Sequence, residues 1–552
     1  MVQKLLFVVM FLTTTIFINS CKQTEKKTDE KESNKKTEIQ MKVEQYAKVK
    51  LTSDLSVLSE NQKKMLPILF EVADIMDDLF WKDAIGNKEE FLNSIEDEAI
   101  KQFAMINYGP WNRMDGDKPF IEGYGEKPPG ANYYPKDITK EEFEAWEDKD
   151  KTSWYTLVRR DDNGKLINVP YHVEYKTEIE KAATLLKKAA ELADDPGFNN
   201  YLELRAEALL TDDYLASDLA WMDMKDNIID FVVGPIESYE DQLFGCRAAH
   251  SGQILIKDIE WSKKLERFGE LLPKLQASLP CDEKYKQEKA RTNSDMNVYD
   301  VIYYAGDCNA AGKNIAINLP NDPRVHEQKG SRKLQLQNAM KAKFDKILVP
   351  ISDVLMAEDQ RQYVKFDAFF ENVMFHEVGH GLGIKNTING KGTVRDALKE
   401  HYSAIEENKA DILGLFLVSK LYEMGEYPEK DLMDNFVTFM AGIFRSVRFG
   451  VASAHGKANM MRFYYFQEQG AFNRDETTGT YSVNFEKMKE AMNSLADMIL
   501  TIQGEGDYEA SKKLIDEKGF IREDLQKDLD RLNEAGIPID IVFEQGIDVL
   551  GI

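Results

Sequence analysis

Two histidines and a glutamate stand close together in an apolar segment with helical periodicity. The segment runs from Phe366 to Leu382 and contains His376, Glu377 and His380 in the order His-Glu-x-x-His. At 3.6 residues per turn, positions 376 and 380 share one helix face, so both imidazoles can bind one metal ion while Glu377 projects beside it. Two histidines leave room for a third protein ligand and a water molecule, which is the geometry of a catalytic zinc site. The alternative is a helix that carries two histidines by chance, in a chain with only seven histidines.

A third ligand is expected on another helix, and an acidic pair opens the next apolar helical run. Glu406 and Glu407 precede Asp411 and the run from Leu413 to Leu417. Acidic residues are common at helix starts because the helix dipole favours them, so simple capping is one interpretation of the pair. Next to a two-histidine site, however, one carboxylate can complete the coordination. The remaining carboxylates are then placed to hold the ligand histidines by hydrogen bonds, above all Asp411, four residues past Glu407 on the same face.

These segments resemble the dipeptidyl peptidase III family of zinc aminodipeptidases. In that family the zinc-binding helix is followed by a Glu-Glu-x-Arg-Ala-Glu segment, and residues 406–411 here read Glu-Glu-Asn-Lys-Ala-Asp. The resemblance implies that Glu407 is the third zinc ligand beside His376 and His380, and that Glu406 and Asp411 surround the ligands. The common family motif has one more residue between the histidines, and some bacterial members share the shorter spacing found here.

Three further segments resemble the same family. Glu237 and Tyr239 match a Glu-x-Tyr segment, which implies a carboxylate for the free amine of the substrate and a tyrosine that stabilises the transition state. Asn318 and Asn321 match an Asn-x-Pro-Asn segment, which implies amides that bind the amino end and backbone of the substrate. His455 matches a histidine that assists the transition state.

Each of these matches also has an ordinary structural interpretation. The Glu-x-Tyr segment is compatible with a strand-end glutamate and a packed tyrosine, the asparagines with a turn, and His455 with a structural histidine. The family often has an arginine four residues after that histidine, to hold the carboxyl end of the substrate. This chain has Asn459 there, with Arg462 three residues later, so the preferred substrate length stays open.

Composition limits the classes of function. The 552 residues, of which 43% are apolar, suffice for two lobes with separate cores. A formal net charge of −25 argues against nucleic-acid binding, because phosphate contacts need a basic surface. No phosphate-binding glycine loop and no nucleotide-hydrolase motif is found. We therefore expect no nucleic acid or nucleotide as a partner. The family resemblance implies peptides as substrates, and we also expect a monomer or weak dimer.

The first residues resemble a bacterial lipoprotein signal. Lys4 precedes an apolar run from Leu5 to Leu12, which is followed by Cys21. We expect cleavage after residue 20, lipid on Cys21, and a disordered charged tether over residues 21–44. The protein would then be anchored in the bacterial cell envelope, facing the periplasm or the surface; an ordinary secretory peptide is the alternative. Three other cysteines allow one disulfide of undetermined pairing: Cys246, Cys281 and Cys308.

The remaining pattern predicts an α+β protein of two lobes. A hairpin is expected between Trp154 and Tyr175, helices over residues 177–225, and strands over 230–236, 253–257 and 298–304. Residues 45–332 are assigned to a mixed lobe. Residues 333–552 are assigned to a helical, zinc-bearing lobe, with a short extended run over 347–351. The family resemblance implies a wide cleft between the lobes and a barrel-like β core in the first.

We therefore predict a zinc-dependent exopeptidase that releases dipeptides from peptide N-termini, with one Zn²⁺ per chain. Glu377 would be the general base, and Tyr239 and His455 would face the oxyanion. One alternative is a zinc endopeptidase that does not count from the N-terminus. Another is a non-catalytic, peptide-binding surface lipoprotein, although a pure binder has no need of a base beside two metal ligands.

Overall fold

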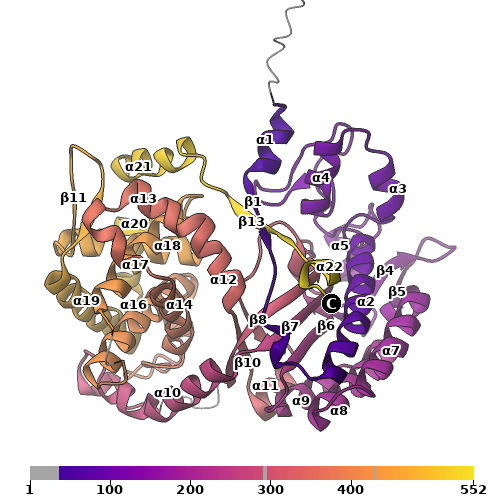
Figure 1. Cartoon of the computed structure of the whole chain (residues 1–552), viewed down its shortest axis with the longest axis horizontal. Helices are drawn as coiled ribbons and strands as arrows, with labels where there is room; N and C mark the ends of the chain where they lie inside the picture. The colour runs from indigo at the N-terminus through magenta and orange to yellow at the C-terminus, as the bar shows by residue number, and fades with distance from the viewer. Residues whose placement is uncertain (1–35, 290–294, 428–429) are drawn as a thin grey trace, which may run out of the picture.

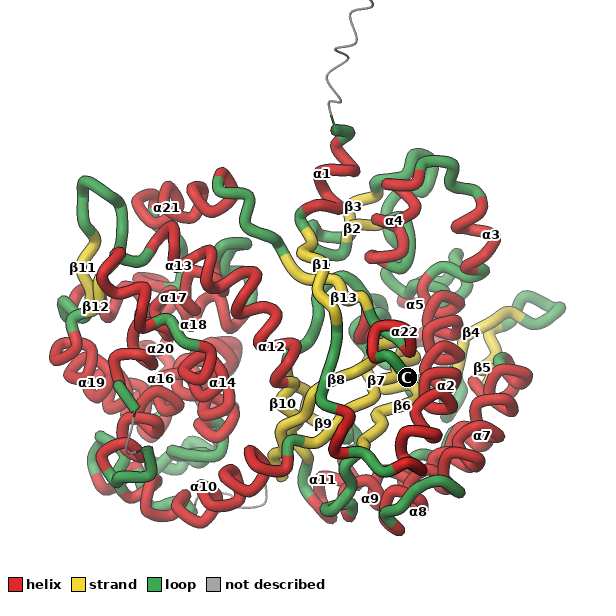
Figure 2. Tube along the Cα trace, viewed as in Figure 1, coloured by secondary structure: helices red, strands yellow, loops and turns green. Residues whose placement is uncertain are grey.

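The chain folds into two lobes that lie side by side (Figure 1). This computed structural model describes residues 36–289, 295–427 and 430–552. Each lobe has its own large buried apolar core. Most strands gather in one lobe, while the other is built almost entirely of helices (Figure 2). The predicted α+β class is confirmed. The predicted lipoprotein signal, Cys21 and most of the tether lie outside the described residues.

The strands of the described chain form one five-stranded sheet and four two-stranded ones. They are β1 (Tyr46–Lys50), β2 (Trp111–Asn112), β3 (Lys118–Pro119), β4 (Thr156–Arg160), β5 (Leu166–Pro170), β6 (Ile229–Glu237), β7 (Ala249–Lys257), β8 (Asp295–Gly306), β9 (Ala316–Leu319), β10 (Arg332–Leu336), β11 (Phe472–Arg474), β12 (Tyr481–Val483) and β13 (Asp540–Glu544). The hairpin β4–β5 is the one predicted around the turn at residues 162–164.

The five-stranded sheet has the order β6-β7-β8-β10-β9 and curls into a half-barrel. Only β8 and β10 run parallel; the other neighbours are antiparallel. Every residue of β7 is buried, which is typical of a strand covered on both faces. Between Pro235 and Glu237 the register of β6 against β7 shifts, so a bulge sets the direction of the strand end that carries Glu237.

Helices from the N-terminal half of the chain, drawn in indigo and purple, cover one side of this sheet (Figure 1). The long α2 packs against β7 and β8, where Gly252 lies close to Ala73. The helices of this lobe are α2 (Glu60–Ala84), α3 (Lys88–Asn93), α4 (Glu98–Asn107), α5 (Lys140–Ala145), α6 (Tyr171–Glu174), α7 (Lys176–Ala190), α8 (Pro196–Thr211), α9 (Leu215–Asp223) and α11 (Pro323–Lys329).

The second lobe surrounds α14 and α16, which pack against each other in its interior. Its helices, with α12 at the junction of the lobes, are α10 (Ile259–Ala277), α12 (Gln337–Lys343), α13 (Val349–Leu355), α14 (Phe366–Gly379), α15 (Val394–Leu398), α16 (Tyr402–Glu423), α17 (Leu432–Val447), α18 (Ala454–Glu468), α19 (Phe485–Glu505), α20 (Tyr508–Lys518) and α21 (Glu523–Glu534). Within the described ranges, no helix combines the length and the apolar character needed to cross a membrane.

The chain passes between the lobes more than once. Phe268 and Leu275 of α10 belong to the core of the helical lobe, although they precede the predicted boundary at residue 332. At the other end, β13 pairs in parallel with β1, so that Tyr46 lies opposite Asp540. The short α22 (Ile547–Leu550) follows and contacts the core of the mixed lobe through Leu550.

Three local predictions differ from the structure. Residues 347–351, predicted as extended, are helical, since a π-helical turn over Phe344–Leu348 runs into α13. A short apolar run does not distinguish strand from helix, and Pro350 fits the first turn of a helix. The hairpin β11–β12 interrupts a region predicted as helical. The last part of the predicted tether forms α1 (Glu38–Glu44), which begins at a capping box on Thr37.

Candidate metal centre

The helix with the His-Glu-x-x-His motif, α14, approaches α16 so closely that two glycines are needed at their crossing. A Cβ on Gly379 would lie 2.5 Å from the carbonyl oxygen of Ala410, and a Cβ on Gly414 would lie 2.8 Å from the backbone nitrogen of His376. Both distances are shorter than real contacts. This close crossing brings His376 of α14 and Glu407 of α16 face to face.

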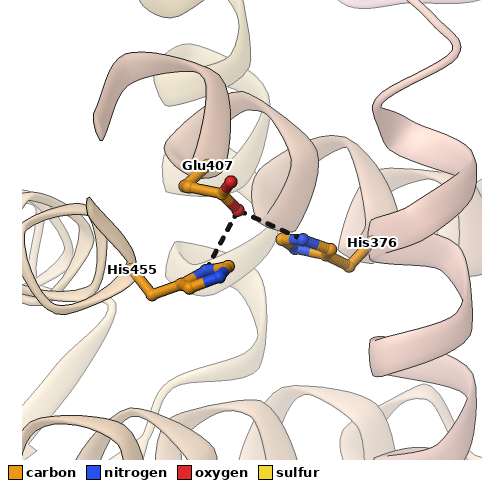
Figure 3. A group of neighbouring side chains, drawn as sticks. All are labelled: His376, Glu407 and His455. Atoms are coloured by element: carbon orange, nitrogen blue, oxygen red, sulfur yellow. Dashed lines mark ion pairs between the residues drawn. The ribbon is translucent and has the colours of Figure 1, made fainter. Parts of the chain in front are cut away.

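Three side chains from three helices converge at this point (Figure 3). His376 Nε2 lies 3.3 Å from Glu407 Oε2, and His455 Nδ1, from the first turn of α18, lies 3.0 Å from the same oxygen. The ligand atoms of His376, Glu407 and His455 all lie within 4.8 Å of one another. Glu407 Oε2 is buried and accepts no hydrogen bond within the described chain. A carboxylate oxygen without a hydrogen bond and the imidazole nitrogens that face it are the ligand atoms that a metal site needs.

His380 stands at the edge of this group. It is the C-cap residue of α14, and its Nε2 lies 3.8 Å from Glu407 Oε2. The compact group therefore contains His455, predicted as a catalytic residue, whereas His380, predicted as a ligand, lies slightly farther away. All three imidazoles nevertheless point a nitrogen toward one carboxylate oxygen.

The outer nitrogens of the two motif histidines are held by carboxylates. His376 Nδ1 lies 2.6 Å from Asp411 Oδ1, and His380 Nδ1 lies 2.9 Å from Glu406 Oε1. Because an ionised carboxylate only accepts hydrogen bonds, each Nδ1–H donates. The Nε2 atoms are then left with the lone pairs that a metal needs. The structure thus places Asp411 beside His376 and Glu406 beside His380.

Cations support these two carboxylates from behind. Arg462 pairs with Asp411, and Lys409 Nζ lies 2.8 Å from Glu406 Oε1. Burial raises the pKa of both carboxyl groups. Arg462 and His376 together lower that of Asp411 by more, and Lys409 and His380 together lower that of Glu406 by more, to about 2 in each case. Both are therefore ionised at neutral pH.

His376 and Glu407 stabilise each other's charged forms. Burial lowers the pKa of His376, but Asp411 and Glu407 raise it by more, to about 10. Burial raises the pKa of Glu407, and the facing His376 and His455 lower it to well below its usual range. The centre therefore carries a negative carboxylate surrounded by groups that bind a proton or another cation.

Glu377, the predicted base, lies beside His376 and is held from the other lobe. Its Oε2 is 2.8 Å from Nζ of Lys333 on β10. Burial raises the pKa of Glu377, but Lys333 and the neighbouring histidines lower it by more. An ionised carboxylate next to a metal site can accept a proton from water.

The predicted substrate-binding residues lie in the sheet lobe. Glu237 ends β6 and is half-buried; burial raises its pKa, and a hydrogen bond from Asn321 opposes the rise. Asn321 also donates to the carbonyl of Ile236 at 3.1 Å. Asn318 lies on β9, and Tyr239 beyond β6 is 77% exposed. No hydrogen bond or ion pair within the described ranges joins Glu237 or Tyr239 to the metal group.

Neither Asn459 nor Arg462 is available to hold the carboxyl end of a substrate in this structure. Asn459 donates to Ser446 Oγ at 2.9 Å, and Arg462 is fully buried against Asp411. Arg462 therefore stabilises the ligand network and does not stand in for the family arginine. All three predicted candidates for a disulfide are free thiols: Cys246, Cys281 and Cys308.

Sequence reasoning missed several members of this network. Lys409 follows Glu406 by three residues, a spacing that favours an ion pair on a helix and was a usable signal. Gln503 Nε2 donates to Glu406 Oε2 at 2.9 Å, and Lys333 pairs with Glu377. Both residues come from distant segments, so no local sequence pattern indicates their contacts.

Imidazole nitrogens gathered around one carboxylate supply the ligand atoms of a candidate metal centre, and comparison with known families identifies the chain as a peptidase. The chain belongs to peptidase family M49, whose family model matches residues 145–426.

Two solved structures and one curated relative are similar to most of this chain. The structure of DPP III from Caldithrix abyssi shares 41% identity with a TM-score of 0.87 and covers 92% of this chain and 98% of its own. The dipeptidyl-peptidase III from Corallococcus sp. strain EGB shares 36% identity with a TM-score of 0.75, over 92% and 96% of the two chains. Nudix hydrolase 3 of Arabidopsis thaliana is 33% identical over 91% of this chain and 73% of its own length.

Proposed function

We propose that this protein is a zinc-dependent exopeptidase that releases dipeptides from the N-termini of peptides. Membership of peptidase family M49 and the likeness to two dipeptidyl-peptidase III structures support peptide hydrolysis. The observation that carries the proposal is the position of Glu407 Oε2, with Glu377 alongside. This buried oxygen faces three imidazole nitrogens and accepts no hydrogen bond from the described residues. Imidazole nitrogen and carboxylate oxygen are common ligands of catalytic zinc.

We assign His376, His380 and Glu407 as the zinc ligands. His376 and His380 each have Nδ1 held by a carboxylate, which orients Nε2 as a ligand. His455 differs, because its Nδ1 faces Glu407 itself while its Nε2 has no hydrogen-bond partner within the described chain, and its side chain is 60% exposed. It is therefore better placed to meet a substrate than to complete a buried coordination shell.

The chemistry follows from these positions. When bound, zinc lowers the pKa of a water molecule and polarises the scissile carbonyl. Glu377 would accept a proton from the attacking water and pass it to the leaving amine. His455 and Tyr239 donate hydrogen bonds to the oxyanion. Glu377 can perform this role at neutral pH because Lys333 keeps its carboxylate ionised.

The sheet lobe would set which bond is cut. Glu237 pairs with the ammonium group of the substrate, and Asn318 and Asn321 bind its backbone. A carboxylate at a fixed distance from the catalytic centre selects the peptide bond that is cut, because it binds the N-terminal ammonium group. An exopeptidase needs such a group, whereas the alternative, a zinc endopeptidase, does not.

The location at the cell envelope is also a proposal. Lipid on Cys21 would anchor the enzyme by its N-terminus and leave both lobes free in solution. Labelling cells with a radioactive fatty acid tests this directly, because Cys21→Ala should abolish the label while the secreted chain keeps its activity.

Product analysis tests the central proposal. A mixed pool of free and N-acetylated peptides is digested with and without a chelator, and the products are identified by mass spectrometry. We expect dipeptides from free peptides only, and none with chelator. Equal cleavage of acetylated peptides would favour an endopeptidase. Stoichiometric zinc without any cleavage would favour a binding protein.

The ligand assignment has its own test. His380→Ala should lose most bound zinc, whereas His455→Ala should keep it and lose turnover. The reverse pattern would make the compact group of His376, Glu407 and His455 the metal site.

A further inference from the structure

Lys333 contacts the proposed general base from the opposite lobe. Its Nζ lies 2.8 Å from the carboxylate Oε2 and 2.8 Å from the backbone oxygen of Glu377. Next to Lys333 on β10, Leu334 belongs to the core of the sheet lobe, whereas Phe375 of α14 belongs to the core of the helical lobe. This ion pair therefore joins the two lobes at the catalytic centre.

The contact also completes the end of the motif helix. The last carbonyl groups of a helix have no partner within it. The carbonyls of His376 and Val378 accept backbone N–H groups of the residues that follow the helix. The carbonyl of Glu377, between them, accepts the hydrogen bond from Lys333. An ammonium group at this position is also favourable for the helix dipole. Lys333 thus fixes both the backbone and the side chain of Glu377.

The same lysine is tied to the predicted substrate-binding strand. In the antiparallel pair β10–β9, Lys333 lies directly opposite Asn318. Side chains of directly opposite residues point to the same face of a sheet. The strand pair that carries Asn318 is therefore held at a set distance from Glu377 through the side chain of Lys333.

Burial makes this contact specific. The side chain of Lys333 is 13% exposed and that of Glu377 is 25% exposed. Within the described chain, the side chain of Lys333 has no other hydrogen-bond or ion-pair partner. A long, flexible ammonium side chain held by a single residue at two atoms acts on that residue alone.

We propose that Lys333 is a positioning residue that clamps Glu377 from the sheet lobe, so that the substrate-binding strand and the general base are held as one unit. The proposal rests on the role of Glu377 in the proposed function. Its effect is on the placement of the base, so the loss should appear in kcat while substrate affinity and zinc content stay the same.

Substitution of Lys333 tests this, with Lys341→Met as a matched control because Lys341 pairs with Asp345 on the exposed side of α12. General-base catalysis contributes about a hundredfold or more, so a misplaced base should lower kcat of Lys333→Met by about tenfold to a hundredfold. We expect KM to change by less than about threefold and zinc to stay stoichiometric. Lys333→Arg, which keeps the charge, should recover most of the rate, and Lys341→Met should match the parent protein.

Every outcome separates this inference from the proposed function. If Glu377→Gln remains active, the proposed function is wrong. If Glu377→Gln is inactive but Lys333→Met turns over at the parent rate, only the role of Lys333 is wrong. If the methionine variant does not fold, Lys333→Gln replaces it. Glutamine keeps a donor for the backbone carbonyl of Glu377 but removes the charge that pairs with the Glu377 carboxylate, so the effect of the ion pair is measured alone. Loss of folding or of zinc in all three variants would mark Lys333 as purely structural and overturn the proposal.

Discussion

Asp411→Asn is the sharpest test of how the ligand network works. The substitution keeps the size of the side chain but removes the charge that holds His376 Nδ1 at 2.6 Å and pairs with Arg462. A charge-assisted hydrogen bond is about twice as strong as a neutral one, so His376 is held less firmly after the substitution. Removal of such a partner of a ligand histidine typically weakens metal binding about tenfold to a hundredfold, so we expect the Kd for zinc to rise by that factor, which is about 1.4 to 2.7 kcal/mol.

The assay is a zinc titration in competition with a chelator of known affinity, together with denaturant unfolding. Stability should also fall, because Arg462 is left buried without its carboxylate. In the double variant Asp411→Asn with Arg462→Met, stability should recover while zinc affinity stays low. Asp345→Asn, on the surface, is the control. An unchanged zinc affinity in Asp411→Asn would refute the reasoning.

Three further predictions follow from the site and its surroundings. Glu377→Gln should bind stoichiometric zinc yet lose nearly all hydrolysis, and rates near the parent value would refute its role as base. Glu237→Gln should lower kcat/KM for peptides with a free amine by about 2 to 4 kcal/mol, and so reduce the ratio of their kcat/KM to that of N-blocked peptides. An unchanged ratio would mean that another residue binds the ammonium group of the substrate. Burial raises the pKa of Glu240, but its ion pairs with Arg113 and Lys127 lower it by more. Because the pKa is lower in the folded protein, these ion pairs contribute their full stability above the ordinary pKa of 4.5. That contribution is lost as the pH falls through the pKa of the folded protein. Glu240→Gln should therefore unfold more easily at pH 7, by about 3 to 5 kcal/mol, and lose less stability on acidification than the parent protein does in denaturant titrations.

The sequence predicts those features that depend on local spacing. The two-lobe α+β class and the hairpin β4–β5 are confirmed, because alternating apolar residues and an Asn-Gly turn act over a few residues. The motif on α14 and the acidic start of α16 likewise follow from the helical period, which puts His376 and His380 on one face.

Contacts between distant segments were out of reach. Nothing near Lys333 in the chain indicates that its side chain lies beside α14, and His455 was assigned to the site only through the family resemblance, since both contacts depend on the packing of separate elements. The helical conformation of residues 347–351 depends on burial in the helical core, where Ile347 and Ile351 are almost inaccessible. Tertiary packing decided the conformation of that short run, which local propensity left open.

The parallel pairing of β1 with β13 has a consequence for biogenesis. Because Tyr46 lies opposite Asp540, this small sheet joins segments from near the two ends of the chain. During synthesis the early segments emerge first and begin to fold, whereas β1 must wait for nearly the whole polypeptide before its partner exists. A nascent or C-terminally truncated chain can therefore build much of each lobe but cannot close this strand pair. Until β13 has been synthesised, β1 therefore lacks this strand partner, and an unpaired strand edge is a site at which an incompletely folded chain can aggregate.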